Sequence, residues 1–267
     1  MTTAKNAGAH EHFPRWANRI LAHHRHTELY QTATMDALLA GVYDGDVTIG
    51  ELLSHGDFGL GTFNQLDGEM VILDGVCHHL RSDGSAVRAG SEERTPFAAV
   101  TWFRSERTLT VSAPTTWSDI CARVDTVTGS ANLIYALKVV GRFDTIRTRT
   151  VRAQTQPYPR LVDAAEGQAE TSFADLRGTL VGFRMPDGDE GISVAGYHLH
   201  FLDEAQSRGG HCLDFQMSRG TVDICTISDM HLSLPRTPQF LAAALGSADS
   251  AAQIRKAEGG HDAANRG

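Results

Sequence analysis

The chain has 267 residues, enough for one large domain or two domains of ordinary size. Hydrophobic residues make up 41% and charged residues 21%, a mixture typical of a globular protein with a buried core. A formal net charge of -8 argues against a nucleic-acid binder that relies on phosphate contacts, and no apolar run reaches the about 20 residues of a membrane span. These properties favour a soluble protein with a small-molecule partner.

Residues 1–28 are predicted to form a mobile N-terminal segment, with one short helix over residues 15–26. The histidines of this segment lack an organised apolar frame, so we interpret them as solvated. The segment contains no apolar run that could serve as a signal peptide. The cysteines of the chain are far apart and form no Cys-x-x-Cys pair. Free thiols and a cytoplasmic location are therefore expected, and a thiolate zinc site is not.

Residues 29–161 are predicted to form a mixed-sheet domain with a few helices. Met35, Leu38, Leu39 and Val42 repeat at helical spacing, and a second helix is predicted over residues 117–126. Short β-prone runs cover residues 60–66, 70–73, 97–103, 108–112 and 133–143. Asp67-Gly68 lies between the first two runs, which indicates a hairpin, and Glu69 follows directly.

A domain boundary is expected near Leu161, because Pro157 and Pro159 cannot continue a central strand. Residues 162–267 then form a β-rich domain with a helical tail over residues 237–258. The four strands expected in this domain cover residues 178–184, 191–202, 211–218 and 221–228. The predicted fold class is therefore α/β (α+β) with two domains, of which the second carries a metal-site hairpin.

His198 and His200 form a His-x-His pair inside one of these predicted strands. Residues i and i+2 of a strand point to the same face, so both imidazoles project together, away from Tyr197, Leu199 and Phe201. The chain turns over residues 203–210, and His211 begins the returning strand. Three neutral histidines with open positions for water or substrate are typical of a catalytic zinc site.

The spacing alone leaves alternatives open. His198 and His200 are equally compatible with exposed histidines on an edge strand, since His-x-His occurs by chance fairly often. Imidazole ligands also suit iron, copper or nickel as well as zinc. The alternating apolar residues around the pair and the hairpin return at His211 favour the metal site.

Four segments together resemble the α-acetolactate decarboxylase family. They read LYQTATMDALLAGVYDG (residues 29–45), GDFGLGTFNQLDGEMVILDG (residues 56–75), TRTVRAQTQPYPRL (residues 148–161) and GYHLHFLDEAQSRGGHCLDF (residues 196–215). Their order and spacing match the family over about residues 29 to 235. The sequence departs from the family at Cys77-His78-His79, which puts the lining of that side of the pocket in question.

The resemblance implies a zinc enzyme, commonly a homodimer, that converts acetolactate (2-hydroxy-2-methyl-3-oxobutanoate) into (R)-acetoin and carbon dioxide. His198, His200 and His211 fall on the zinc-binding histidines of the family. Glu69 falls on the glutamate of a conserved motif and Arg149 on an active-site arginine. The glutamate that the family uses in its C-terminal tail corresponds to Glu258, although the tail aligns loosely.

These residue types suit the chemistry of a β-keto acid. A metal acts as a Lewis acid on the negative charge that develops when carbon dioxide leaves. Arg149 is expected to hold the carboxylate by a bidentate contact, and Glu69 or Glu258 to deliver the proton. The competing interpretations are a surface ion pair for Arg149, a surface residue after a turn for Glu69 and a solvated helix residue for Glu258.

Two other functions remain open from the residues alone. One is a non-catalytic, metal-dependent β module that binds a metabolite, which requires neither Arg149 nor Glu69. The other is a metal-dependent hydrolase, in which the metal activates water.

Overall fold

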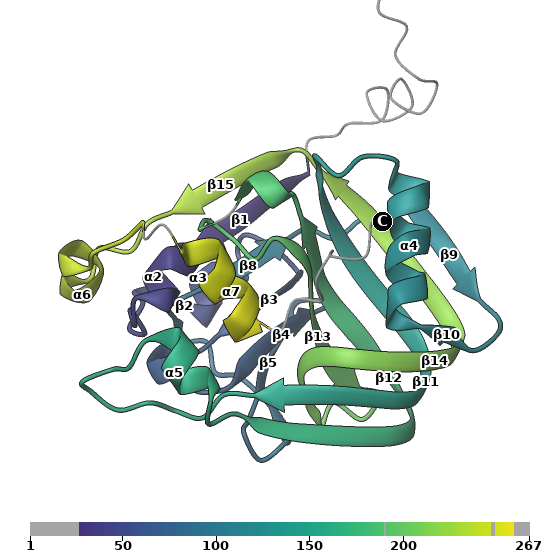
Figure 1. Ribbon diagram of the computed structural model, residues 1–267, viewed down its shortest axis with the longest axis horizontal. Coiled ribbons are helices and arrows are strands. Elements are labelled where there is room, and N and C mark those ends of the chain that lie inside the picture. Colours follow the sequence, from purple (N-terminus) through teal and green to yellow (C-terminus); the bar gives the residue numbers. More distant parts are fainter. Residues whose placement is uncertain (1–26, 190, 247–248, 259–267) are drawn as a thin grey trace, which may run out of the picture.

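The computed structural model describes residues 27–189, 191–246 and 249–258 and shows a mostly β protein with two principal sheets (Figure 1). The predicted N-terminal helix lies outside the described residues. The first sheet has seven strands in the order β15-β1-β8-β3-β4-β5-β6. Its strands are β1 (Glu28–Thr32), β3 (Phe58–Thr62), β4 (Glu69–Leu73), β5 (Val76–Leu80), β6 (Ala86–Arg88), β8 (Ala98–Thr101) and β15 (Asp229–Ser233). All neighbours in this sheet are antiparallel except β1 and β15.

The second sheet contains the long strands of the molecule, in the order β10-β14-β11-β12-β13, with β9 also paired to β14. Its strands are β9 (Arg107–Val111), β10 (Thr115–Thr116), β11 (Ile134–Thr150), β12 (Ala169–Met185), β13 (Gly196–Asp203) and β14 (Gly209–Ile227). β13 pairs with both β12 and the start of β14. The sheet therefore contains a closed ring of paired strands, β11, β12, β13 and β14. A short pair, β2 (Val47–Thr48) and β7 (Arg94–Thr95), completes the strands of the described residues.

The helices are short and lie around the sheets. α2 (Met35–Leu39), α5 (Leu161–Ala165) and α7 (Ser250–Glu258) contact one another at one end of the molecule, and α6 (Pro238–Ala242) extends beyond them (Figure 1). α3 (Ile49–Leu52) follows β2, and α4 (Trp117–Thr128) packs on the second sheet through Ile120 and Val124. Thr116 begins α4 with a capping box to Asp119, which satisfies the backbone amide groups of these two residues. None of the described helices has the length and apolar character needed to cross a membrane.

One core cluster joins the two principal sheets. Val71 and Leu73 of β4 meet Val181 and Phe183 of β12 in this cluster, and all four are buried. The predicted boundary near Leu161 does not separate the sheets, because β11 precedes it yet pairs with β12 and β14. In the other direction, β15 follows β14 of the second sheet in the chain but pairs with β1 of the first. The mixed α/β class is confirmed, and the two-domain division stays a prediction.

Several predicted elements differ from the observed ones for clear physical reasons. The first helix covers only Met35–Leu39, because the preceding residues form β1 between β8 and β15. The strands predicted at 211–218 and 221–228 are one continuous strand, β14. Residues 219–220, left between these two predicted strands, continue the strand: Gly220 lies opposite Gly141, where a Cβ would stand 2.2 Å from the Val140 carbonyl oxygen. The predicted hairpin at Asp67-Gly68 is confirmed by the antiparallel pairing of β3 and β4.

Candidate metal centre

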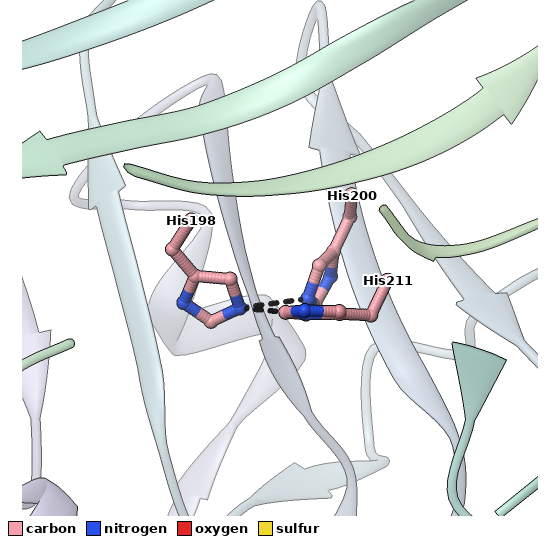
Figure 2. A group of neighbouring side chains, drawn as sticks. All are labelled: His198, His200 and His211. Carbon is pink, nitrogen blue, oxygen red and sulfur yellow. Dashed lines mark hydrogen bonds between the residues drawn. The ribbon is translucent and has the colours of Figure 1, made fainter. Parts of the chain in front are cut away.

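The hairpin of β13 and β14 places three histidine side chains in one buried cluster (Figure 2). His198 and His200 lie on β13, and His211 is directly opposite His200 on β14. Leu199 and Phe201 project to the other face, into the core of the second sheet, as the strand alternation predicts. The expected convergence of His198, His200 and His211 is therefore confirmed.

Glycine is required where β14 begins, beside this cluster. Gly210 has a φ of +158°, and a Cβ there would stand 2.9 Å from both the Arg149 carbonyl oxygen and the Thr150 hydroxyl. A side chain at this position would push β14 away from β11. Because Gly210 has no side chain, His211 can come into register with both His200 and Arg149.

The ring nitrogens of the three histidines converge. His198 Nε2 lies 3.1 Å from His200 Nε2 and 3.1 Å from His211 Nδ1. Two nitrogens that bind one zinc ion tetrahedrally at about 2.1 Å are about 3.4 Å apart, so the observed spacing is close to that of ligands sharing one cation. Together the three residues could hold one metal ion.

Backbone carbonyls fix the orientation of two of the rings. His200 Nδ1 donates to the Met70 carbonyl at 2.8 Å, and His211 Nε2 donates to the Glu258 carbonyl at 2.9 Å. Since a carbonyl oxygen only accepts, these nitrogens carry the ring protons, and the other nitrogen of each neutral ring has a lone pair. Both lone pairs face His198 Nε2, which could donate a hydrogen bond to them as N–H or, as a third lone pair, share one cation with them. The donor set therefore fits a metal ion.

Burial keeps these histidines neutral. It lowers the pKa of His198 and of His200 to about 3, with the charge of Arg149 the next cause for His198 and the proximity of His198 the next cause for His200. The pKa of His211 is also well below its ordinary value, first through burial and then through Arg149. Neutral imidazole is the form that binds metal, so the cluster is ready for ligation at neutral pH.

Glu69 approaches the cluster from the first sheet. It begins β4 immediately after the Asp67-Gly68 turn, and its Oε2 lies 3.7 Å from His200 Nε2. Burial and the nearby Glu258 carboxylate raise the pKa of Glu69 to about 8, against the opposing effects of Arg149 and of the Val151 N–H. The interpretation of Glu69 as an exposed residue after a turn is wrong, since its side chain is only 13% exposed.

Arg149 and Glu258 reach the same place from distant parts of the chain. Arg149 lies near the end of β11, is buried, and donates from Nη2 to Glu258 Oε2 at 3.3 Å. The same Glu258 oxygen lies 3.7 Å from His198 Nε2 and 3.7 Å from His211 Nδ1. The surface interpretations of Arg149 and Glu258 are therefore wrong, and all six residues singled out in the sequence are adjacent.

A pocket opens beside the cluster between β3, β4 and the helices α2, α5 and α7. Its polar wall contains Glu69, Arg149, His198, His200 and Glu258. Its apolar wall contains Met35, Leu38, Leu66, Phe97, Val151 and Leu161. His78 and His79 do not line it; His79 stacks on Phe63 instead, with ring centroids 4.0 Å apart.

Sequence reasoning missed the apolar wall and the two carbonyl partners of the histidines. Met35 and Leu38 belonged to the helical periodicity of the sequence, which marks a buried face but does not distinguish a pocket wall from a core. The Met70 carbonyl carries no side-chain signal, so its contact with His200 depends entirely on how the two sheets pack.

The fold and site define a mostly β protein with a buried three-histidine centre, next to one arginine and two carboxylates. Residues 29–247 match the family model described as alpha-acetolactate decarboxylase. The chain is 48% identical to the alpha-acetolactate decarboxylase of Methylococcus capsulatus, covering 84% of this chain and 86% of the relative. It is 44% identical to that of Klebsiella aerogenes, covering 89% and 91%.

A solved structure supports the same relationship. The crystal structure of alpha-acetolactate decarboxylase from Bacillus subtilis strain 168 aligns with a TM-score of 0.85 and 42% identity, over 86% of this chain and 99% of that one. The chain belongs to the alpha-acetolactate decarboxylase family, whose named members are carboxy-lyases.

Proposed function

We propose that this protein decarboxylates acetolactate to (R)-acetoin and carbon dioxide, with one zinc ion held by His198, His200 and His211. The observation that carries the proposal is the set of inward-facing imidazole nitrogens, 3.1 Å apart, beside a buried arginine and two carboxylates. The named activity of relatives 42–48% identical over most of the chain supports the same reaction.

The chemistry divides between the metal and the surrounding side chains. When bound, zinc supplies a Lewis acid that stabilises the negative charge left by the departing carbon dioxide. Arg149 binds the substrate carboxylate, because its buried guanidinium is the cation among the described residues that line the pocket and offers a planar pair of donors. The apolar wall accommodates the methyl groups and excludes water.

The two glutamates approach different parts of the cluster. Glu69 lies beside His200, whereas Glu258 lies beside both His198 and His211. One of them delivers the proton that completes acetoin; in the metal-free site, burial raises the pKa of Glu69 to about 8, which favours its protonated form. Either glutamate is also close enough to the histidine nitrogens to share the metal.

Zinc removal and restoration test the proposal. Carbon dioxide and acetoin are measured from racemic acetolactate with the purified protein, after chelation and after zinc is returned. We expect turnover to disappear with chelation and to return with zinc. His198→Ala should contain no zinc and show no turnover, whereas His231→Ala, which changes an exposed histidine of β15, should match the wild type.

Other outcomes point to other functions. Zinc bound without any turnover of acetolactate would favour the metabolite-binding module, and ester hydrolysis without action on acetolactate would favour the hydrolase. Unchanged zinc content in His198→Ala contradicts the metal site itself. The homodimer and the cytoplasmic location stay predictions; sedimentation velocity tests the first.

A further inference from the structure

The three histidines differ in what holds them. The outer nitrogen of His200 is tied to β4, a central strand of the first sheet, through the Met70 carbonyl. The outer nitrogen of His211 is tied instead to α7, through the Glu258 carbonyl at 2.9 Å. The tautomer of His211, and hence the lone pair on Nδ1, therefore depends on where a short helix is docked.

The described contacts of α7 include one buried apolar face and polar pairs at its surface. Ile254 and Ala257 are its buried residues and pack in a cluster with residues of α2 and α5. Gln253 accepts a hydrogen bond from Arg160 at 2.9 Å, and Lys256 pairs with the exposed Glu166 at 3.6 Å. A helix held in this way undocks more easily than a strand in the middle of a sheet.

The end of α7 that faces the cluster is its C-terminal end. The last carbonyls of a helix have no partner within it, and His211 provides one for Glu258. These carbonyls also carry partial negative charge, which favours a cation nearby. The Glu258 carboxylate adds a second link, since it contacts Arg149 at 3.3 Å. Backbone and side chain of one residue therefore join α7 to the metal centre.

We propose that α7 is a positioning element for the metal: its docked state fixes the tautomer of His211 through the Glu258 carbonyl and so strengthens metal binding. The inference rests on the metal site of the proposed function. Coupling of this kind is reciprocal, so metal binding also holds α7 against α2 and α5. Loss of an outer hydrogen-bond partner of a metal-binding histidine typically costs about 10- to 100-fold in metal affinity.

The test weakens docking without changing any side chain of the site. Ile254→Asp places a charge in the buried contact of α7, whereas Ala252→Asp places the same charge on its exposed face and is the matched control. Zinc affinity is measured by competition with a chromophoric chelator. We expect Ile254→Asp to bind zinc about 10- to 100-fold more weakly than the wild type. Ala252→Asp should match the wild type. The conservative variant Ile254→Val should retain most of the zinc affinity.

Three further measurements separate the role of the Glu258 carbonyl from that of its carboxylate and from a general loss of structure. Glu258→Ala keeps the backbone carbonyl, so it should lose less zinc affinity than Ile254→Asp. Long-range proton–nitrogen spectra of the histidine rings should show His211 protonated at Nε2 in the wild type and a mixture of tautomers in Ile254→Asp. Zinc should also slow amide exchange in residues 250–258 of the wild type.

The outcomes are distinguishable. Wild-type zinc affinity in Ile254→Asp, with binding lost in His198→Ala, overturns the role of α7 and leaves the metal site intact. Equal losses in Glu258→Ala and Ile254→Asp would assign the coupling to the carboxylate and overturn the role of the carbonyl. Absence of zinc binding in the wild type removes the proposed function together with this inference.

Discussion

Arg149 on β11 and His211 on β14 are register partners in the second sheet, although they lie far apart in the sequence. Because His211 is in turn the register partner of His200, one row across three strands carries a fixed cation and two imidazoles. The guanidinium is therefore positioned by strand pairing and not by a flexible loop. Its separation from the histidine cluster is set by the spacing of strands in the sheet.

We expect Arg149→Lys to lower kcat/KM about 10- to 100-fold, because losing one charged hydrogen bond costs about 1.5–3 kcal/mol and lysine cannot replace a planar pair of donors. Steady-state kinetics with acetolactate measure the effect. Arg147→Lys is the matched control, since Arg147 lies on the same strand with its side chain 52% exposed. Full activity in Arg149→Lys would show that the bidentate contact with the substrate is wrong.

Glu69→Gln should retain most of the zinc and abolish turnover, because the amide keeps the shape of the side chain but has no acidic proton to deliver. Elemental analysis of the purified variant and an acetoin assay check the two parts separately. Loss of zinc from Glu69→Gln would instead identify Glu69 as a metal ligand, and Glu258→Gln provides the comparison.

Glu69 also gives the metal-free protein a characteristic pH dependence. Its carboxyl group has a folded-state pKa of about 8, above the ordinary value of 4.5, so the folded state binds more protons between these values. Stability therefore falls as pH rises through this window. The histidines act oppositely below about pH 6.5, since the pKa values of His198 and His200 are lowered to about 3.

The two effects separate above about pH 6.5, where an unperturbed histidine is already mostly neutral in the unfolded chain. Urea unfolding of the metal-free wild type should give a stability that declines between about pH 6.5 and 8. Glu69→Gln should lack this decline. A decline of equal size in the variant would assign the pH dependence to another group.

Gly210→Ala should destabilise the protein by about 1–3 kcal/mol and weaken zinc binding, because its Cβ would collide with the backbone of β11 and displace His211. Gly188→Ala is the control, since a Cβ there meets nothing within 4 Å, and its cost should stay within about 0.5 kcal/mol. Chemical denaturation and a zinc titration measure both effects. Normal zinc affinity in Gly210→Ala would show that the hairpin tolerates the change.

Phe201→Ala should cost about 3–5 kcal/mol, because this buried ring packs edge-on against Phe143 on the face of β13 opposite the histidines. Leu241→Ala, at a side chain 74% exposed, should change stability by less than about 0.5 kcal/mol. Urea unfolding followed by circular dichroism compares the two. A small effect at Phe201 would mean that the cluster does not depend on the core behind it.

The histidine centre could be predicted from the sequence because its geometry is local. Alternation along one strand makes His198 and His200 converge, and a short turn returns the chain at His211. The positions of Arg149 and Glu258 could not be predicted in this way. They depend on the pairing of β11 with β14 and on the docking of α7, which involve residues far apart in the chain. Only the family resemblance singled them out.

The distinction between local and long-range features also applies to the fold. The hairpin at Asp67-Gly68 was predictable because its turn residues lie beside the strands that they connect. The division at Leu161 was inferred from two prolines, but the partners of β11 lie beyond that point, and no local signal reveals them. Gly220 was expected to separate two strands, whereas close approach to the neighbouring backbone is the reason for glycine there.

Each half of the chain contributes strands to both sheets, which has a consequence if the chain is cut into two fragments. β11 comes before Leu161 yet belongs to the second sheet, and β15 comes after it yet belongs to the first. A chain split at the exposed Gly167 would give two fragments, each missing strands that its own sheet needs. Glu69 and Arg149 would be on one fragment and all three histidines on the other. The complete centre would therefore form only if the two fragments reassociated.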